Sequence, residues 1–313
     1  MNQSWIPLSD PDISLPEIEA VTGALQSAQL VGEPAVEAFE EAFAVYIGRG
    51  HGVAVASGGI GFLLMLKAYG IGVGHEVIAS PYSWRKAAHA IILAGAKPAF
   101  AAIDYWAGTL VPAKAGARIT EKSPRNRGRQ SECTSAPWTE LQELATQRGL
   151  TLIEDSTEAI GSGYKGSVVG SFGDCAIFGF HQPGPLPCGD SGMVVTDNAE
   201  IASVLRRLRG RRRDERKSVV TGREAPHQAV MSDVAAILGL AQLRRTDQIL
   251  TRRKQTERWR FEYVKSFEGI KDAEHKVTRA NHGRTDAERH LRRFDGRPRG
   301  PVSRAGRARP GGR

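Results

Sequence analysis

Residues 175–196 give the clearest fold signal, reading Cys-Ala-Ile-Phe-Gly-Phe-His-Gln-Pro-Gly-Pro-Leu-Pro-Cys-Gly-Asp-Ser-Gly-Met-Val-Val-Thr. Two apolar runs within it, Cys175–Phe180 and Met193–Thr196, have the length and composition of buried strands. The residues between them are rich in proline and glycine, which interrupt regular structure. The stretch therefore predicts two buried strands joined by a loop.

Working outward from this stretch, short apolar runs alternate with segments of helical spacing. Further strands are expected at His51–Ala56, Glu76–Ser80, Pro98–Ile103 and Thr151–Glu154. Helices are expected from Pro16, over Pro34–Tyr46, Phe62–Tyr69, Trp84–Ala94, Trp138–Gln147 and Ala199–Leu208, and from Met231 to about Val264. This alternation predicts an α/β fold built on a mostly parallel sheet with helices on both faces.

Length and composition narrow the class of protein. A chain of 313 residues can form one large domain and a smaller one, and 41% hydrophobic with 25% charged residues is ordinary for a soluble globular protein. No run of 18 apolar residues and no secretory leader is visible, which argues against a membrane partner. Cys133, Cys175 and Cys188 are too few and too scattered for a disulfide framework or a zinc site. We expect a cytoplasmic protein with reduced thiols and no bound metal.

The net charge of +9 is concentrated at one end of the chain. In residues 276–313 the basic side chains outnumber the acidic ones by nine, so the remainder is close to neutral. This segment contains one aromatic residue, Phe294, and its composition is typical of a disordered tail. A nucleic-acid partner is therefore not expected, although a nucleic-acid role of the tail remains a third interpretation.

Two segments interrupt the alternation. Residues 121–135 are polar and basic where a buried strand is expected, and residues 276–313 are rich in Arg, Gly and Pro where a second domain is expected. We expect residues 1–264 to form the large domain, with an N-terminal arm, and residues 265–313 to be an incomplete small domain or a basic tail. Both segments can be interpreted as frameshift products, or as a genuine loop and a genuine tail.

The turn Ser57-Gly58-Gly59-Ile60-Gly61 lies between an expected strand and an expected helix. Such a turn directs backbone N–H groups and the positive end of the helix dipole at an anion, ideally a phosphate. A tight turn without a ligand is the alternative.

Asp155 follows an expected buried strand, at the edge where open α/β sheets bind ligands. A helix N-cap or a solvated turn is an equally good interpretation of this residue. Trp84 begins an expected helix, where an aromatic residue often only packs a helix end.

Residues 178–192 resemble the Ser-Phe-His-x-x-Lys-x-x-x-x-Gly-Glu-Gly-Gly signature of the DegT/DnrJ/StrS-type sugar aminotransferases, which are fold-type-I enzymes carrying pyridoxal 5′-phosphate (PLP). The resemblance covers residues 5–118 and 136–270. It implies a large domain, a small C-terminal domain and a homodimer with its site at the interface. It also implies amino transfer from glutamate to a nucleotide-linked keto-sugar, in polysaccharide or secondary-metabolite biosynthesis.

The resemblance implies a site for PLP or pyridoxamine 5′-phosphate (PMP). Gly58, Gly59 and Ile60 would hold the phosphate, Trp84 would stack on the ring, and Asp155 would pair with the ring nitrogen. The other implied cofactor-binding positions are Glu158, Gly179, His181 and Gln228. In the family the residue at the position of Gln228 reaches the cofactor of the partner subunit.

The sequence departs from the family pattern at positions that carry chemistry. Gly184 stands where the family has the lysine that forms a Schiff base with the cofactor, and Gly59 and Gly179 stand where it has hydroxyl side chains. Two hypotheses follow. The chain is either an enzyme with a relocated amine, such as Lys86, or a non-catalytic protein: a pseudoenzyme with a binding or regulatory role, or a frameshifted remnant.

Overall fold

The computed structural model describes most of the chain up to residue 265. The described ranges are 11–26, 33–83, 85–104, 108–120, 136–182, 184–210 and 226–265, with the backbone alone at 33 and 260–265. The expectations for Trp84, for residues 121–135 and for the tail lie outside these ranges. The division into domains at residues 264 and 265 therefore stays a prediction.

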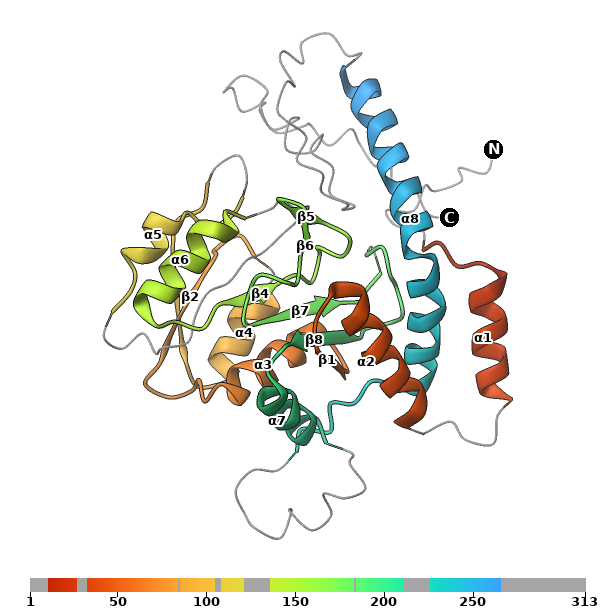
Figure 1. The fold of residues 1–313 in the computed structure, drawn as a ribbon, viewed down its shortest axis with the longest axis horizontal. Helices are drawn as coiled ribbons and strands as arrows, with labels where there is room; N and C mark the ends of the chain where they lie inside the picture. Colours follow the sequence, from red (N-terminus) through yellow and green to blue (C-terminus); the bar gives the residue numbers. More distant parts are fainter. Residues whose placement is uncertain are drawn as a thin grey trace, which may run out of the picture.

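A four-stranded sheet forms the centre of the fold (Figure 1). Its strands, in spatial order, are β1 (His51–Val55), β8 (Gly192–Thr196), β7 (Cys175–Gly179) and β4 (Ile153–Asp155). β4 pairs with β7 in parallel, whereas β8 pairs antiparallel with both β7 and β1. Three strands thus share one direction and β8 runs against them, so the mostly parallel sheet that we predicted is a mixed sheet with one reversed strand.

Two further strand pairs accompany this sheet. β2 (Glu76–Ala79) and β3 (Lys97–Phe100) pair in parallel, and β5 (Gly163–Tyr164) and β6 (Ser167–Val168) form an antiparallel hairpin. Among the described residues no hydrogen-bonded ladder joins β2 and β3 to the four-stranded sheet. The chain segment in which the alternation called for another strand, 121–135, is outside the described ranges.

Helices cover both faces of the sheet, as predicted (Figure 1). One face carries α3 (Gly58–Ala68), α4 (Arg85–Leu93) and α7 (Ala199–Arg209), and the other carries α2 (Glu33–Ile47) and α8 (Asp233–Lys265). α1 (Leu15–Leu25) lies against α8, and α5 (Pro112–Gly116) and α6 (Trp138–Arg148) lie beside β2. The two-faced arrangement follows from the strands, whose residues alternate between the two cores: Val53 and Val55 face α3, and Ala54 faces α2.

The start of α3 differs from our expectation. We predicted a tight turn at residues 57–61 and a helix from Phe62, but α3 begins at Gly58. Ser57 is extended and its Oγ accepts a hydrogen bond from the N–H of Ile60 at 3.3 Å, so Ser57 is the N-cap and the glycines form the first helical turn. Gly61 also has a packing reason, because a Cβ there would come within 2.5 Å of Ile177 Cδ1 on β7.

Buried charges cover the open edge of β1. The carboxylate of Glu40 on α2 accepts from the N–H of Ala54 at 2.9 Å and from Arg209, which also donates to the carbonyl of Ala54 at 2.9 Å. Arg206 donates to the carbonyl of Gly52 at 2.8 Å. These contacts satisfy backbone groups that an edge strand otherwise leaves unpaired.

Candidate functional site

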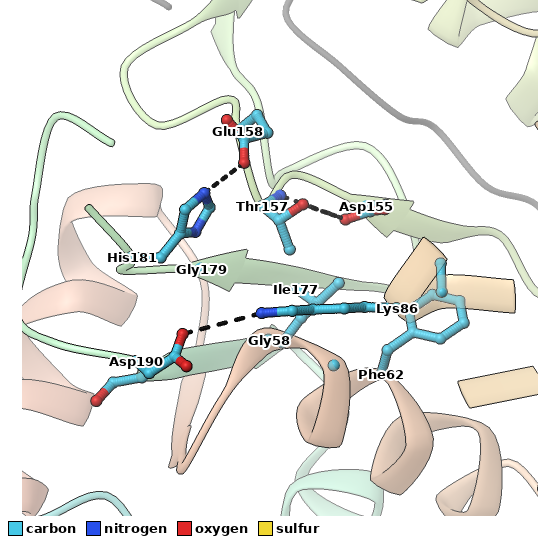
Figure 2. A pocket seen from close by; sticks show the side chains of 13 residues that line it. Gly58, Phe62, Lys86, Asp155, Thr157, Glu158, Ile177, Gly179, His181 and Asp190 are labelled. Atoms are coloured by element: carbon cyan, nitrogen blue, oxygen red, sulfur yellow. Dashed lines mark hydrogen bonds and ion pairs between the residues drawn. The ribbon is translucent and has the colours of Figure 1, made fainter. Parts of the chain in front are cut away.

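A cavity of about 270 Å³ opens where the three strands of common direction end (Figure 2). It is lined by Gly58, Gly59, Phe62, Lys86, Ala87, Asp155, Thr157, Glu158, Ile177, Gly179, His181, Asp190 and Ser191. Asp155 ends β4, Gly179 ends β7, and Gly58 follows β1. This is the carboxyl edge at which open α/β sheets bind ligands, and the volume is close to the smaller ligand pockets of roughly 300 Å³.

The N-terminus of α3 forms one side of the cavity. Gly58 and Gly59 occupy its first turn, and within the described residues their N–H groups donate to no acceptor. Ile60, which we also predicted to bind the phosphate, does not line the cavity, and its N–H donates to Ser57 Oγ. The two glycine amides, together with the helix dipole, present positive potential suited to an anion.

Close packing of glycines holds this helix end against the sheet. A Cβ on Gly192 would come 2.7 Å from the nitrogen of Gly58 and 2.9 Å from the carbonyl oxygen of Phe178. Gly192 pairs with Gly179 across β7 and β8. Because no side chain separates these backbones, the amides of α3 reach the cavity wall.

Asp155 presents a carboxylate to the cavity. It is 5% exposed, and its Oδ1 accepts from Thr157 Oγ1 at 2.8 Å and from the N–H of Thr157 at 3.4 Å. The sequence therefore identified the acidic residue at the end of β4 that lines the cavity, whereas the lining residue Thr157 was missed. Its position two residues after Asp155, on the same strand end, was the available signal.

The neighbouring carboxylate, Glu154, is fully buried and does not line the cavity. It accepts from Ser156 Oγ at 2.9 Å and from the N–H groups of Gly170, Phe172 at 3.1 Å and Gly173 at 3.2 Å. Burial raises the pKa of Glu154, although these four donors act in the opposite direction. Glu154 thus organises the turn that leads into β7.

Glu158 and His181 form a contact pair at the cavity wall. Oε1 of Glu158 lies 2.6 Å from Nε2 of His181 (Figure 2). A Cβ on Gly179 would come 3.1 Å from His181 Nδ1, so the glycine leaves room for the imidazole in this position. The pairing counters the negative charge that Glu158 brings to the cavity whenever His181 is protonated.

Lys86 extends across the cavity from the first turn of α4 (Figure 2). Its stem lies over Gly59, because a Cβ on Gly59 would come 3.4 Å from Lys86 Cβ and 3.6 Å from Lys86 Cδ. Its Nζ lies 3.9 Å from Oδ1 of Asp190, which precedes β8. Both side chains are largely exposed, so the ion pair holds the amine only loosely.

Gly184, at the position of the signature lysine, contributes nothing to the cavity lining. Its N–H donates to the carbonyl of His181 at 3.0 Å, and its own carbonyl accepts from Arg253 of α8 at 2.7 Å. The loop is therefore anchored at this point, and it carries no amine there.

Residues 11–289 match the model of the DegT/DnrJ/EryC1/StrS aminotransferase family. The chain belongs to this family. The spore coat polysaccharide biosynthesis protein SpsC of Bacillus subtilis (strain 168) is 36% identical over 264 residues, which cover 80% of this chain and 67% of SpsC.

Two solved structures, those of DesV and DesI, share the fold. DesV of S. venezuelae, in complex with a ketimine intermediate, has 29% sequence identity and a TM-score of 0.70, covering 81% of this chain and 67% of DesV. DesI, analysed in the presence of its TDP-sugar product, has 27% identity and a TM-score of 0.75, covering 86% of this chain and 68% of DesI. The α/β fold of PLP-dependent aminotransferases is confirmed, and PLP is the cofactor of the family.

The cavity residues fit this cofactor of the family. The amides of Gly58 and Gly59 suit a phosphate, and the carboxylate of Asp155 suits a protonated ring nitrogen. Lys86 brings an amine into the same space. The hydroxyl groups absent at positions 59 and 179 have neighbours of the same chemistry, because Thr157 and Ser191 also line the cavity.

Among the described residues, two predicted cofactor positions, Ile60 and Gln228, do not line the cavity. Gln228 is exposed, has a φ of 49° and is absent from the cavity lining of its own chain. Trp84 lies outside the described residues. Besides Thr157, the sequence analysis missed Phe62, Ala87, Ile177, Asp190 and Ser191 as lining residues. Asp190 and Ser191 belong to the family signature, but packing alone brings in the apolar ones.

The two cysteines in the described part of the chain are poor candidates for chemistry. Cys175 and Cys188 are buried, and burial raises the pKa of both thiols, that of Cys188 to about 12. The described residues hold no group of three or more His, Cys, Asp or Glu side chains that suits a metal ion. Of the described helices, none combines the length and the hydropathy needed to cross a membrane.

Proposed function

We propose that this chain binds PLP or PMP in the cavity at the carboxyl ends of β1, β7 and β4. We further propose that it transfers an amino group from glutamate to a nucleotide-linked keto-sugar, in polysaccharide or secondary-metabolite biosynthesis. The observation that carries the proposal is the meeting of two helix-end amides, a buried carboxylate and a lysine in one cavity. Membership of the family supports the reaction class.

Each cavity residue has a role in this proposal. The N–H groups of Gly58 and Gly59 hold the phosphate, and Asp155, oriented by Thr157, accepts the N–H of the pyridine ring. His181 and Glu158 bring an imidazole and a carboxylate to one wall of the cavity, with Nε2 and Oε1 2.6 Å apart, as groups that can move a proton beside the ring. The bound cofactor supplies an electron sink for amino-group transfer.

The sugar ligand and the quaternary structure are part of the proposal. DesI was analysed with its TDP-sugar product, which supports a nucleotide-sugar ligand here. A homodimer accounts for Gln228, which is exposed and outside the cavity of its own chain. It also accounts for α1, where Leu15, Ile18 and Leu25 are more than half exposed at helical spacing. Light scattering tests the dimer, and a monomer at micromolar concentration would contradict it.

A second candidate function is a non-catalytic cofactor-binding protein. The observation in its favour is Gly184, which leaves the signature position without an amine. Binding of the cofactor without turnover of an amino donor is its distinguishing property.

The experiment is the half-reaction with glutamate. Purified protein is loaded with PLP, freed of excess by gel filtration and mixed with glutamate, and PMP and 2-oxoglutarate are measured. Stoichiometric formation of both is the expected result. Retention of PLP without conversion would favour the non-catalytic protein, and failure to retain any cofactor would contradict both functions.

A further inference from the structure

We propose that Lys86 is the amine that bonds to the cofactor aldehyde in this cavity, in place of the lysine missing at position 184. The inference rests on the proposed function and deepens it, since it names the residue that makes the covalent contact.

The first argument is position. Lys86 lines the cavity, whereas the other lysines whose side chains the structure describes do not. Those are Lys67, Lys97, Lys114, Lys165 and Lys254. Figure 2 shows the Lys86 side chain lying across the cavity between Gly58 and Gly179, with its nitrogen directed toward Asp190. An amine that lines the cavity can reach the aldehyde of a bound cofactor, which a covalent contact requires.

The second argument is the fit between Lys86 and Gly59. A Cβ on Gly59 would lie 3.4 Å from Lys86 Cβ and 3.6 Å from Lys86 Cδ, which are ordinary van der Waals distances. The stem of Lys86 therefore runs directly over Gly59, at the helix end that borders the cavity.

The third argument is the set of charged groups around the amine. Asp190 Oδ1 lies 3.9 Å from Nζ, and the Glu158–His181 pair lies on the opposite wall (Figure 2). The ammonium first gives one proton to solvent, to which the largely exposed Lys86 side chain has access. The nitrogen lone pair then attacks the aldehyde carbon and a C–N bond forms. The carbonyl oxygen leaves as water with the two remaining N–H protons, and a C=N bond results.

Borohydride trapping tests the assignment on the full-length chain. The protein is incubated with PLP at a one-to-one ratio, reduced with borohydride, digested and mapped by mass spectrometry. The expected result is a single modified peptide containing Lys86, lost in Lys86→Arg and retained in the control Lys97→Arg. Lys97 is a suitable control because it is an exposed lysine outside the cavity.

Binding of PMP separates this inference from the proposed function. PMP carries no aldehyde, so its binding to the unmodified protein needs no covalent contact to lysine and reports the cavity alone. PMP binding by the unmodified protein, combined with a PLP adduct on another lysine or with no adduct, would overturn the Lys86 assignment and leave the proposed function standing. Loss of PMP binding by the unmodified protein would overturn both.

Discussion

The turn at residues 170–174, which leads into β7, is held by buried charges, whereas the loop at residues 180–191, which leaves β7, is held by backbone contacts and one arginine. In the turn, Glu154 accepts from three backbone amides, and Arg49 donates to two carbonyl groups. Arg49 is in turn paired with Asp197 at 2.6 Å. A buried polar network in which the members are satisfied makes a rigid support.

The loop after β7 contains the stretch that resembles the family signature, but it has glycine at position 184 where the family has lysine. Its backbone is anchored by Arg253 on the carbonyl of Gly184 and by the bond from the N–H of Cys188 to the carbonyl of Phe180 at 3.0 Å. His181 still reaches the cavity from this loop. The turn and the loop thus both have anchored backbones, and the loop carries glycine at the position of the signature lysine.

The largest expected effect comes from breaking the turn. Glu154→Ala leaves three buried amides without their acceptor, at about 1–3 kcal/mol each, so the free energy of unfolding should fall by about 3 kcal/mol or more. Urea denaturation measures it, with Glu143→Ala on the exposed face of α6 as the control, which should change stability by less than about 0.5 kcal/mol. A loss below about 1 kcal/mol for Glu154→Ala would contradict the role of this carboxylate.

The next largest effect tests whether Asp155 serves ligand binding while its neighbour Glu154 serves stability. Asp155→Asn should weaken PMP binding by roughly 10- to 100-fold, because it removes the charged acceptor of a hydrogen bond worth about 1.5–3 kcal/mol. Its stability should change far less than that of Glu154→Ala. Fluorescence titration with PMP measures the affinity, and Asp197→Asn, outside the cavity, serves as the control. Equal affinities of Asp155→Asn and the control would remove Asp155 from the site.

A third test restores the amine to the loop. In Gly184→Lys the new Cβ would meet the carbonyl oxygen of His181 at 3.1 Å, which the loop can relieve by a small shift at a cost of about 1 kcal/mol. In a Lys86→Arg background this change should return a borohydride-trapped adduct, now on residue 184. A folded double variant that forms no adduct would show that the loop has lost more than its lysine.

The smallest expected effect concerns how the free energy of unfolding depends on pH through Asp197, the partner of the arginine that supports the turn. Burial acts to raise the pKa of Asp197, but the N–H of Gly50 and the guanidinium of Arg49 outweigh it and hold that pKa below its usual value. Because the pKa of Asp197 is lower in the folded state than in the unfolded state, ionised Asp197 stabilises the fold at pH values above the unfolded-state pKa of about 3.9. This stabilisation is lost as the pH falls through the folded-state pKa. Urea denaturation from about pH 6 to about pH 3 should show a shallower acid decline in Asp197→Asn than in the parent. Identical slopes would contradict this linkage.

The fold followed from the sequence because buried strands and amphipathic helices have different periodicities. The runs at Cys175–Phe180 and Met193–Thr196 predicted β7 and β8 to within one residue at each end. Strand direction carries no such signal, so the reversal of β8 was not expected. Ser57 was assigned to a turn because a glycine-rich strand–helix junction has the same composition whether or not the glycines are helical.

The candidate site was predictable only where a motif lies on a single segment. Asp155 was found because strand ends face the ligand edge of an α/β sheet. The pairing of Glu158 with His181, which are 23 positions apart, and the passage of Lys86 over Gly59 depend on how separate elements pack. The sequence offered Lys86 as a hypothesis, but only the approach of α4 to α3 places its side chain in the cavity.

The most direct measurement is equilibrium dialysis of the unmodified full-length protein against PMP. PMP has no aldehyde, so its binding reports the cavity itself and not the general reactivity of lysines. The account predicts saturable binding of one PMP per chain that weakens in Asp155→Asn. The absence of saturable binding, or binding that Asp155→Asn leaves unchanged, would contradict the claim that this cavity holds the cofactor.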